Sequence, residues 1–162
     1  MNGYLVKWYG PYDDDTLVQN DTKNCLYLIT GKKKHQRNQS ILYCGITKRT
    51  VSDRVNDKNH KSWNVVREIQ YWVGVVDYSR KPSEYLLRKL EHILIYFLKT
   101  EENSQNKDSL PKRRMILVNQ WYRPDGIRRK NQIHEAQKLQ DLIFFSENEW
   151  LICNTLKIPK EK

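Results

Sequence analysis

Short runs of apolar residues, separated by polar stretches, recur along the chain and predict a series of β-strands. The runs at 25–30 (CLYLIT) and 41–46 (ILYCGI) have the length and composition of buried strands. The polar segment GKKKHQRNQS lies between them, so a hairpin with a long basic loop is the simplest connection. A third run at 69–76 (IQYWVGVV) is rich in β-branched and aromatic residues and is the strongest strand signal in the sequence.

Two helices are predicted between and after these strands. Thr50 and Asp53 have the spacing of a capping box, which predicts a helix from about residue 51 towards residue 59. Pro82 and Ser83 are helix start signals, and the apolar residues after them recur with helical periodicity. These apolar residues are Leu86, Leu87, Leu90, Ile93, Leu94, Phe97 and Leu98.

The remaining segments add further elements at both ends. Residues 1–24 are expected to form an N-terminal strand or arm, and a short strand is predicted at 115–118. After a basic, turn-rich segment, residues 134–145 are predicted to be helical, and residues 150–153 to form a last strand or an ordered tail. This order, β–β–α–β–α with additions, predicts an α+β fold built on a small mixed or antiparallel sheet with flanking helices.

Positive charge is concentrated in two blocks. The chain of 162 residues carries 29 lysines and arginines against 19 acidic residues, a net charge of +10. Nine basic residues occur with two acidic ones between residues 31 and 61, and eight occur with two between residues 107 and 130. Such clustering favours a polyanionic partner. A basic surface without a partner is the alternative that charge alone leaves open.

Cysteine usage and hydropathy bear on the location of the protein. Cys25, Cys44 and Cys153 are an odd number with no CxxC spacing, and buried free thiols in a reducing cytoplasm are the simplest interpretation. The longest apolar run, residues 93–98, is too short to cross a bilayer, and the first ten residues contain no apolar leader segment. We therefore expect a cytoplasmic protein without a membrane partner.

Several polar residues stand at positions suited to phosphate chemistry. Tyr27 and Tyr43 lie near the middle of the first two predicted strands and would share one face of the sheet if these strands pair. Gly45 ends the second strand, where the missing side chain would let a backbone or a phosphate come close. Arg54 lies one turn into the next helix, where its guanidinium would fork onto phosphate oxygens. Glu91 falls on the seam between the apolar and polar faces of the long helix.

Each of these residues also has an ordinary structural interpretation. Tyrosines are commonly buried or half-buried in a core, and an arginine on a helix is usually solvated. Glu91 has the right spacing for a surface ion pair with Arg88, three residues before it. The order of the residues along the chain, rather than any one of them, makes the pattern specific.

That order resembles the GIY-YIG nuclease family. The first motif reads CLY at 25–27, and the second reads YCG at 43–45. Arg54 matches the arginine of the family, and Glu91 matches its metal-binding glutamate. Asn119, in the segment ILVNQ, matches the asparagine that completes the set.

The sequence departs from the family pattern at several points. Cys25 stands in place of the first glycine, and the loop before Tyr43 is longer and more basic than in compact members. Arg54 follows Tyr43 by eleven residues, where many members have ten. His60 follows Arg54 by six residues, whereas several members place a histidine four after their arginine. The loop before Asn119 is also long.

The resemblance implies an endonuclease, of restriction or phage type, that hydrolyses DNA phosphodiester bonds with a divalent metal ion. Glu91 would hold one Mg²⁺ (or Mn²⁺), whose other ligands would be water and substrate. Arg54 would bind the scissile phosphate. Tyr27 would orient or deprotonate the attacking water with the help of Tyr43, and Asn119 would hold the site together.

Lys48 and His60 are candidate assisting residues. A free phenol has a pKa of about 10 and is a poor base at neutral pH unless positive charge lies nearby. From its position in the sequence, Lys48 is expected to supply part of that charge.

The basic blocks are expected to contact the backbone of duplex DNA on either side of this site. A homodimer is one way to cut both strands, and a monomer that acts twice is another. The expected organisation is a single domain, 1–162, with a nuclease-like core at 25–119, an N-terminal arm at 1–24 and a C-terminal extension at 120–162. The alternative function is a non-catalytic nucleic-acid-binding module on the same scaffold. The candidate DNA-contacting residues are Lys32, Lys33, Lys34, Arg37, Lys112, Arg113, Arg114, Arg128, Arg129 and Lys130.

Overall fold

The computed structural model describes residues 2–65, 67–77, 81–107, 109, 114–130, 139, 141–146 and 149–153. Within these residues the chain forms a seven-stranded sheet with the strand order β3-β2-β4-β1-β5-β6-β7. The elements are β1 (Asn2–Tyr12), α1 (Asp14–Leu17), β2 (Cys25–Lys32), β3 (Ser40–Thr47), α2 (Val51–Val55), a 3₁₀ helix η1 (Lys61–Asn64), β4 (Arg67–Asp77), α3 (Glu84–Leu98), β5 (Met115–Tyr122), β6 (Leu142–Ser146) and β7 (Glu149–Cys153).

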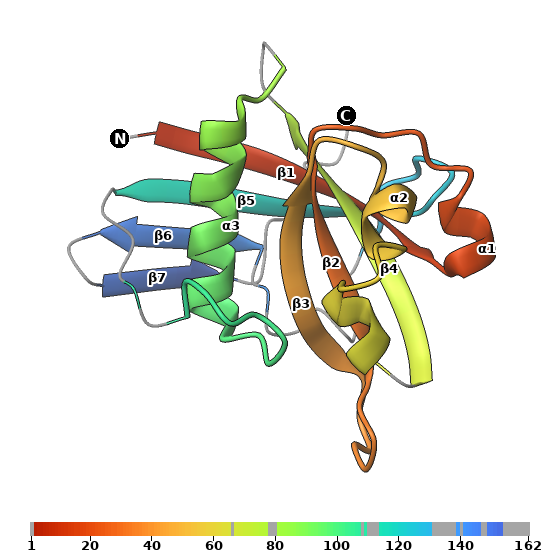
Figure 1. Ribbon diagram of the computed structural model, residues 1–162. Coiled ribbons are helices and arrows are strands. Elements are labelled where there is room, and N and C mark those ends of the chain that lie inside the picture. Colours follow the sequence, from red (N-terminus) through yellow and green to blue (C-terminus); the bar gives the residue numbers. More distant parts are fainter. Residues whose placement is uncertain are drawn as a thin grey trace.

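The sheet is mixed, and its first strand lies at its centre. β1 pairs in antiparallel fashion with β4 and in parallel fashion with β5, so the expected N-terminal strand or arm is an interior strand. β2 forms a hairpin with β3 and also pairs with β4, as the pattern of apolar runs predicts. Figure 1 shows α3 lying across β1, β5, β6 and β7, with α1 and α2 at the opposite end of the sheet beside β4. The α+β class with a mixed sheet is thus confirmed.

The two faces of the sheet are covered by two separate hydrophobic cores. Leu26 and Leu28 of β2 belong to the core that α3 covers, whereas Tyr27 and Ile29 belong to the core that α1 and α2 cover. This alternation follows from the pleat, which sends successive side chains of a strand to opposite faces. Tyr27 therefore lies on the face opposite to the one that α3 covers.

β3 is the last strand at its end of the sheet, and its outward backbone groups are bonded by the loop that follows α3. The side-chain amide of Asn103 donates to the carbonyl of Cys44 (2.8 Å) and accepts from the N–H of the same residue (2.9 Å). The N–H of Glu102 donates to the carbonyl of Leu42 (3.0 Å). An exposed strand edge is a liability, and these contacts fasten the loop after α3 to β3.

Two predicted helices differ from the observed elements. The first was expected to run towards residue 59, but α2 ends at Val55, and the chain then turns into η1. The second was expected at 134–145, but its last residues form β6, which pairs with β5 and buries Ile143 and Phe145 on alternate positions. Apolar residues in such a short run fit either the helical or the strand period. The segment forms a strand because it pairs with the edge of β5. Residues 131–138 lie outside the described part of the chain.

The other predicted elements agree with the structure. Besides β1, strands occur where they were predicted, at 25–30, 41–46, 69–76, 115–118 and 150–153. The helix α3 begins after its N-cap Ser83, whose hydroxyl accepts the N–H of Leu86. Cys25 and Cys44 are buried free thiols, as predicted. The side chain of Cys153 lies outside the described part of the chain. Among the described helices, none combines the length and the apolar composition needed to cross a membrane.

Replacing Asn103 by Ala should lower the free energy of unfolding by roughly 2–4 kcal/mol, because it leaves two buried backbone groups of Cys44 without partners. The measurement is urea unfolding followed by circular dichroism. Gln105→Ala, an exposed position in the same loop, is the matched control and should change the value by less than about 0.5 kcal/mol. Equal effects of the two variants would show that the amide of Asn103 does not hold the strand edge.

Candidate active site

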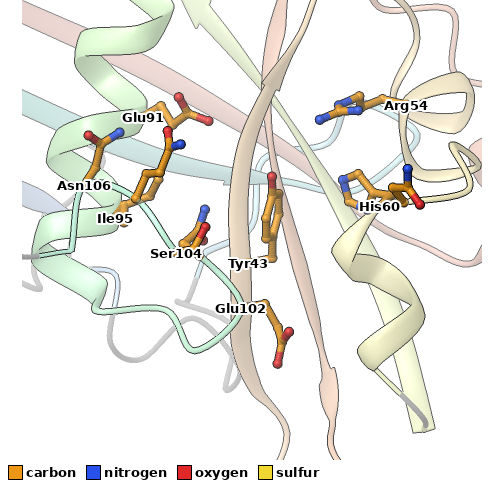
Figure 2. A pocket seen from close by; sticks show the side chains of 11 residues that line it. Tyr43, Arg54, His60, Glu91, Ile95, Glu102, Ser104 and Asn106 are labelled. Atoms are coloured by element: carbon orange, nitrogen blue, oxygen red, sulfur yellow. The ribbon is translucent and has the colours of Figure 1, made fainter.

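A polar pocket of about 250 Å³ opens beside the edge strand β3. Because β3 is the last strand, side chains from both faces of the sheet reach this edge. Figure 2 shows Glu91 approaching from α3 on one side of Tyr43, with Arg54 and His60 approaching from the other. Further lining residues come from the loop after α3, among them Glu102, Asn103 and Ser104.

The two motif tyrosines are packed around a glycine. Tyr27 on β2 lies directly opposite Gly45 on β3, and the rings of Tyr27 and Tyr43 lie 5.8 Å apart. A Cβ atom on Gly45 would come within 2.6 Å of the Tyr27 phenol and 2.7 Å of the Tyr43 ring. A larger residue at this position would therefore displace both phenols. The sequence suggested that the missing side chain would let a backbone or a phosphate come close. The two tyrosines instead fill this space.

The two phenols differ in exposure. Tyr27 is 0% exposed, whereas Tyr43 is half-buried and lines the pocket. Burial raises the pKa of Tyr27 far above its usual value, and it also raises the pKa of Tyr43. The two phenols are also hydrogen-bonded to each other.

His60 begins a chain of hydrogen bonds that ends at the pocket. Its Nδ1 accepts the backbone N–H of Ser62 (2.9 Å), so in the neutral ring the proton is on Nε2. Nε2–H then donates to Tyr27 Oη (2.7 Å), so the phenol proton of Tyr27 is left for its hydrogen bond with Tyr43. His60 is buried, and burial, followed by the charge of Arg54, lowers its pKa to about 4. The ring is therefore neutral at physiological pH.

Arg54 is held at the mouth of the pocket by the first turn of α2. Thr50 caps this helix by accepting the N–H of Asp53 (3.1 Å). The partly exposed Arg54 guanidinium donates to Asp57 (2.8 Å). Its positive charge lowers the pKa of both phenols. A guanidinium has five N–H donors, so one contact with Asp57 leaves others for an anion in the pocket.

Glu91 lies at the seam of α3, as its position on the helix predicts. Its carboxylate accepts the backbone N–H of Ile46 on β3, which ties α3 to the strand edge. Burial raises the pKa of Glu91 to about 7, and Arg88, the N–H of Ile46 and Arg54 act in the opposite direction. Arg88 forms its ion pair with Glu84 (2.7 Å).

The donor set of the pocket fits a hard divalent cation that keeps most of its water. A half-buried carboxylate with a raised pKa gains from a nearby positive charge, because a cation offsets the cost of its desolvation. Among the described residues, no three or more His, Cys, Asp and Glu side chains come together to hold a metal ion. Glu91 would be the protein carboxylate, and Mg²⁺ accepts such a water-rich site.

The prediction that Asn119 belongs to this site is wrong. Asn119 lies on β5, which is separated from β3 by β1, β4 and β2, each pair of neighbours roughly 4.8 Å apart. Its side chain is 1% exposed and accepts the indole N–H of Trp8 (2.8 Å). Three other asparagines, Asn59, Asn106 and Asn103, line the pocket, and Asn103 bonds the edge of β3. In the sequence its position shortly after the long helix is the only signal, and the loop that carries it has no periodic pattern.

Lys48 does not take the expected position beside the phenols. Its ammonium group pairs with Glu84 (2.5 Å), and the residue lines a second pocket beyond Arg54. Arg54 is the nearby cation that lowers the pKa of the two tyrosines.

The predicted DNA-contacting residues fall into groups with different surroundings. Lys32 pairs with Glu68, and Lys33 pairs with Glu101 and Glu102, so these two lysines fasten the hairpin loop. Arg129 donates to the carbonyl of Gly10 (3.1 Å) and supports the turn after β5. Lys34, Arg37, Arg114 and Lys130 are exposed and Arg128 is half-buried, whereas Lys112 and Arg113 lie outside the described residues.

The neutral, buried state of His60 predicts a pH dependence of stability. Between about pH 6.5 and pH 4 the unfolded chain binds a proton at His60 that the folded chain does not bind, so acidification favours unfolding. We expect the stability of the wild type, relative to His60→Gln, to fall across this window and to be constant above it. The raised pKa of Glu91 acts in the opposite direction but is present in both proteins. Urea unfolding at several pH values measures the difference, and a flat difference would contradict a neutral His60.

Comparison with known proteins gives one partial similarity. No family model matches the chain, and no solved structure matches it. The chain is 35% identical over 81 residues to the Holliday junction branch migration complex subunit RuvA from two strains of Ureaplasma parvum serovar 3. The matched segment is 49% of this chain and 39% of each relative, so the chain spans about two fifths of the length of the curated relatives it matches.

Proposed function

We propose that the protein is a metal-dependent endonuclease of the GIY-YIG type that hydrolyses phosphodiester bonds in DNA. One observation carries this proposal: a tyrosine, a histidine, an arginine and a glutamate from distant parts of the chain line one polar pocket at the edge of the sheet, and a second, buried tyrosine, Tyr27, is hydrogen-bonded to the histidine behind it. Hydrolysis of a phosphodiester needs a positioned water, a bound phosphate and compensation of the charge that develops on its oxygens. The pocket offers a residue for each of these tasks.

Arg54 is the phosphate-binding residue in this proposal. Its guanidinium stands at the mouth of the pocket and is fixed from behind by Asp57. A charge-assisted hydrogen bond from an arginine stabilises an anionic oxygen more strongly than a neutral donor does. Its contribution grows as negative charge develops on the phosphate.

The exposure of the two phenols favours a different division of roles from the one expected from the sequence. Tyr43 faces the pocket and would orient the attacking water and take its proton, because the buried Tyr27 has no access to it. Tyr27 acts through Tyr43: its hydrogen bond lowers the pKa of the Tyr43 phenol. His60 fixes the direction of this chain by donating to Tyr27.

Glu91 would hold the divalent metal ion, Mg²⁺ or Mn²⁺. The bound ion would polarise a phosphate oxygen and lower the pKa of a coordinated water. The carboxylate is kept in place by the N–H of Ile46, so a change at Glu91 that preserves the acceptor oxygen also preserves this link between α3 and β3.

DNA is the proposed substrate because of the charge of the chain and the name of its partial relatives. The exposed basic residues Lys34, Arg37 and Lys130 offer backbone contacts that do not depend on base sequence. The RuvA proteins are named as subunits of a Holliday junction complex, which supports DNA, including branched DNA, as the partner. We further propose a cytoplasmic location, which suits the buried free thiols, and joint action of two copies on the two strands.

A non-catalytic DNA-binding module is the second candidate function. The observation in its favour is that the partial relatives are named for branch migration and not for hydrolysis. Binding of duplex or branched DNA without any turnover in the presence of Mg²⁺ or Mn²⁺ is the result that would select it.

Glu91→Gln should abolish Mg²⁺-dependent nicking of supercoiled plasmid, by at least about 10³-fold, because the amide loses the negative charge that holds the cation. Binding of a labelled duplex in the presence of EDTA should stay within about twofold of the wild type, since Gln retains an oxygen for the N–H of Ile46. Asp53→Asn, an exposed carboxylate on α2, is the matched control and should leave nicking unchanged. Nicking by Glu91→Gln at the wild-type rate would refute the metal site.

Replacing each tyrosine by Phe should separate their roles. Tyr43→Phe should lower the nicking rate by about 10²–10⁴-fold and remove its rise with pH, because the group that takes the proton is lost. Tyr27→Phe should retain activity but shift this rise to higher pH, because Tyr43 then loses the hydrogen bond that lowers its pKa. The measurement is the single-turnover rate between pH 6 and pH 10. A larger loss with Tyr27→Phe than with Tyr43→Phe would reverse the assignment.

A further inference from the structure

A second pocket, of about 230 Å³, shares Arg54 with the first. It is formed where β3 runs into α2 and where α3 begins. Four cationic side chains line it, together with a single carboxylate and backbone around Thr47. The cations are Lys48, Arg49, Arg54 and Arg88, and the carboxylate is Glu84.

These four cations are held in two pairs, each around one carboxylate. Asp57 accepts from Arg49 (2.6 Å) and Arg54 (2.8 Å). Glu84 accepts from Lys48 (2.5 Å) and Arg88 (2.7 Å). Each pair keeps one surplus positive charge, and the pKa of each carboxyl group is lowered by its two partners.

The surplus charge comes with unused hydrogen-bond donors. An arginine has five N–H donors and a lysine has three, so a single shared carboxylate does not saturate either pair. The pairing also keeps four long side chains near one position. The pocket is thus prepared for an anion with several oxygen atoms.

Arg54 belongs to the lining of both pockets. Phosphates repeat at a short, regular spacing along one nucleic-acid strand. A strand that places one phosphate at Arg54 beside Tyr43 and Glu91 must therefore place a neighbouring phosphate close by. The second pocket shares this guanidinium and is therefore close enough to receive the neighbouring phosphate.

We propose that the second pocket is a phosphate subsite, in which Lys48, Arg49 and Arg88 hold the phosphodiester next to the one that is cleaved. This inference deepens the proposed function, on which it rests for the position of the scissile phosphate. Arg54 then bridges two consecutive phosphates of one strand and sets the register of the strand over the first pocket. Glu84 competes with the substrate for Lys48 and Arg88, so its carboxylate weakens binding.

Opposite effects of two changes in one pocket provide the test. Lys48→Ala combined with Arg88→Ala should weaken binding of a labelled duplex about tenfold in EDTA. It should also reduce the slope of log affinity against log salt by about one, the value for one lost phosphate contact. Glu84→Gln should instead strengthen binding by at least about threefold. Lys89→Ala, which removes a cation that lies over Tyr85 on the same helix, is the matched control and should change affinity less than twofold.

A free anion provides a second readout that does not depend on DNA or on catalysis. Titration with inorganic phosphate should shift the backbone amide NMR signals of Thr47, Lys48 and Arg49. The shifts should be lost in the double variant and should appear at lower phosphate concentration in Glu84→Gln. Shifts with phosphate but no effect on duplex affinity would identify a site for a free phosphate compound and would overturn the strand subsite.

The failure of this inference and that of the proposed function give different results. If the wild type cuts DNA but the double variant binds duplex with the wild-type affinity and salt slope, the subsite is refuted and the nuclease stands. If no DNA is cut but Glu84→Gln and the double variant change affinity in opposite directions, the subsite stands as a DNA-binding site. Weaker duplex binding by Glu84→Gln would also refute the subsite. This single variant keeps the test valid even if the double variant does not fold.

Discussion

The open edge of β3 is the constraint on which the rest of the site depends. The last strand of a sheet has backbone groups that point away from its neighbour and need partners. Here the partners come from Glu91 on α3 and from Glu102 and Asn103 in the loop that follows it. The contacts that complete the sheet therefore also bring a carboxylate from one face to within reach of the phenols and the guanidinium on the other.

The same edge explains why the site combines buried and exposed groups. Tyr27 and His60 are buried, and burial raises the pKa of the Tyr27 phenol and lowers that of the His60 imidazole. Tyr43 and Arg54 are partly exposed and line the pocket. Glu91 is half-buried, so its charge is costly without a cation. This gradient from apolar interior to solvent is typical of sites where pKa values are tuned by environment.

The basic residues divide in a way that net charge alone does not reveal. Lys32 and Lys33 hold the hairpin loop against acidic neighbours, and Arg129 bonds a backbone carbonyl. Lys48 and Arg88 instead share one carboxylate at a pocket beside Arg54. A basic block in the sequence thus contains both structural ion pairs and cations with surplus charge, and only their acidic neighbours in space distinguish the two kinds.

The sequence by itself determined the strands with strong apolar runs, the long amphipathic helix and the closeness in space of Tyr27, Tyr43, Arg54 and Glu91. These predictions succeeded because Tyr27, Tyr43 and Arg54 lie on consecutive elements, where hairpin pairing and a short connection fix their neighbours, and because helical periodicity places Glu91 on a seam. The tertiary structure alone decided the position of Asn119 away from the pocket, the strand in place of a helix after residue 141, and the pairing of Lys48 with an acid on α3. Each of these depends on which distant segment covers a sheet edge or meets a charge, and such long-range contacts leave no periodic trace in the order of the residues.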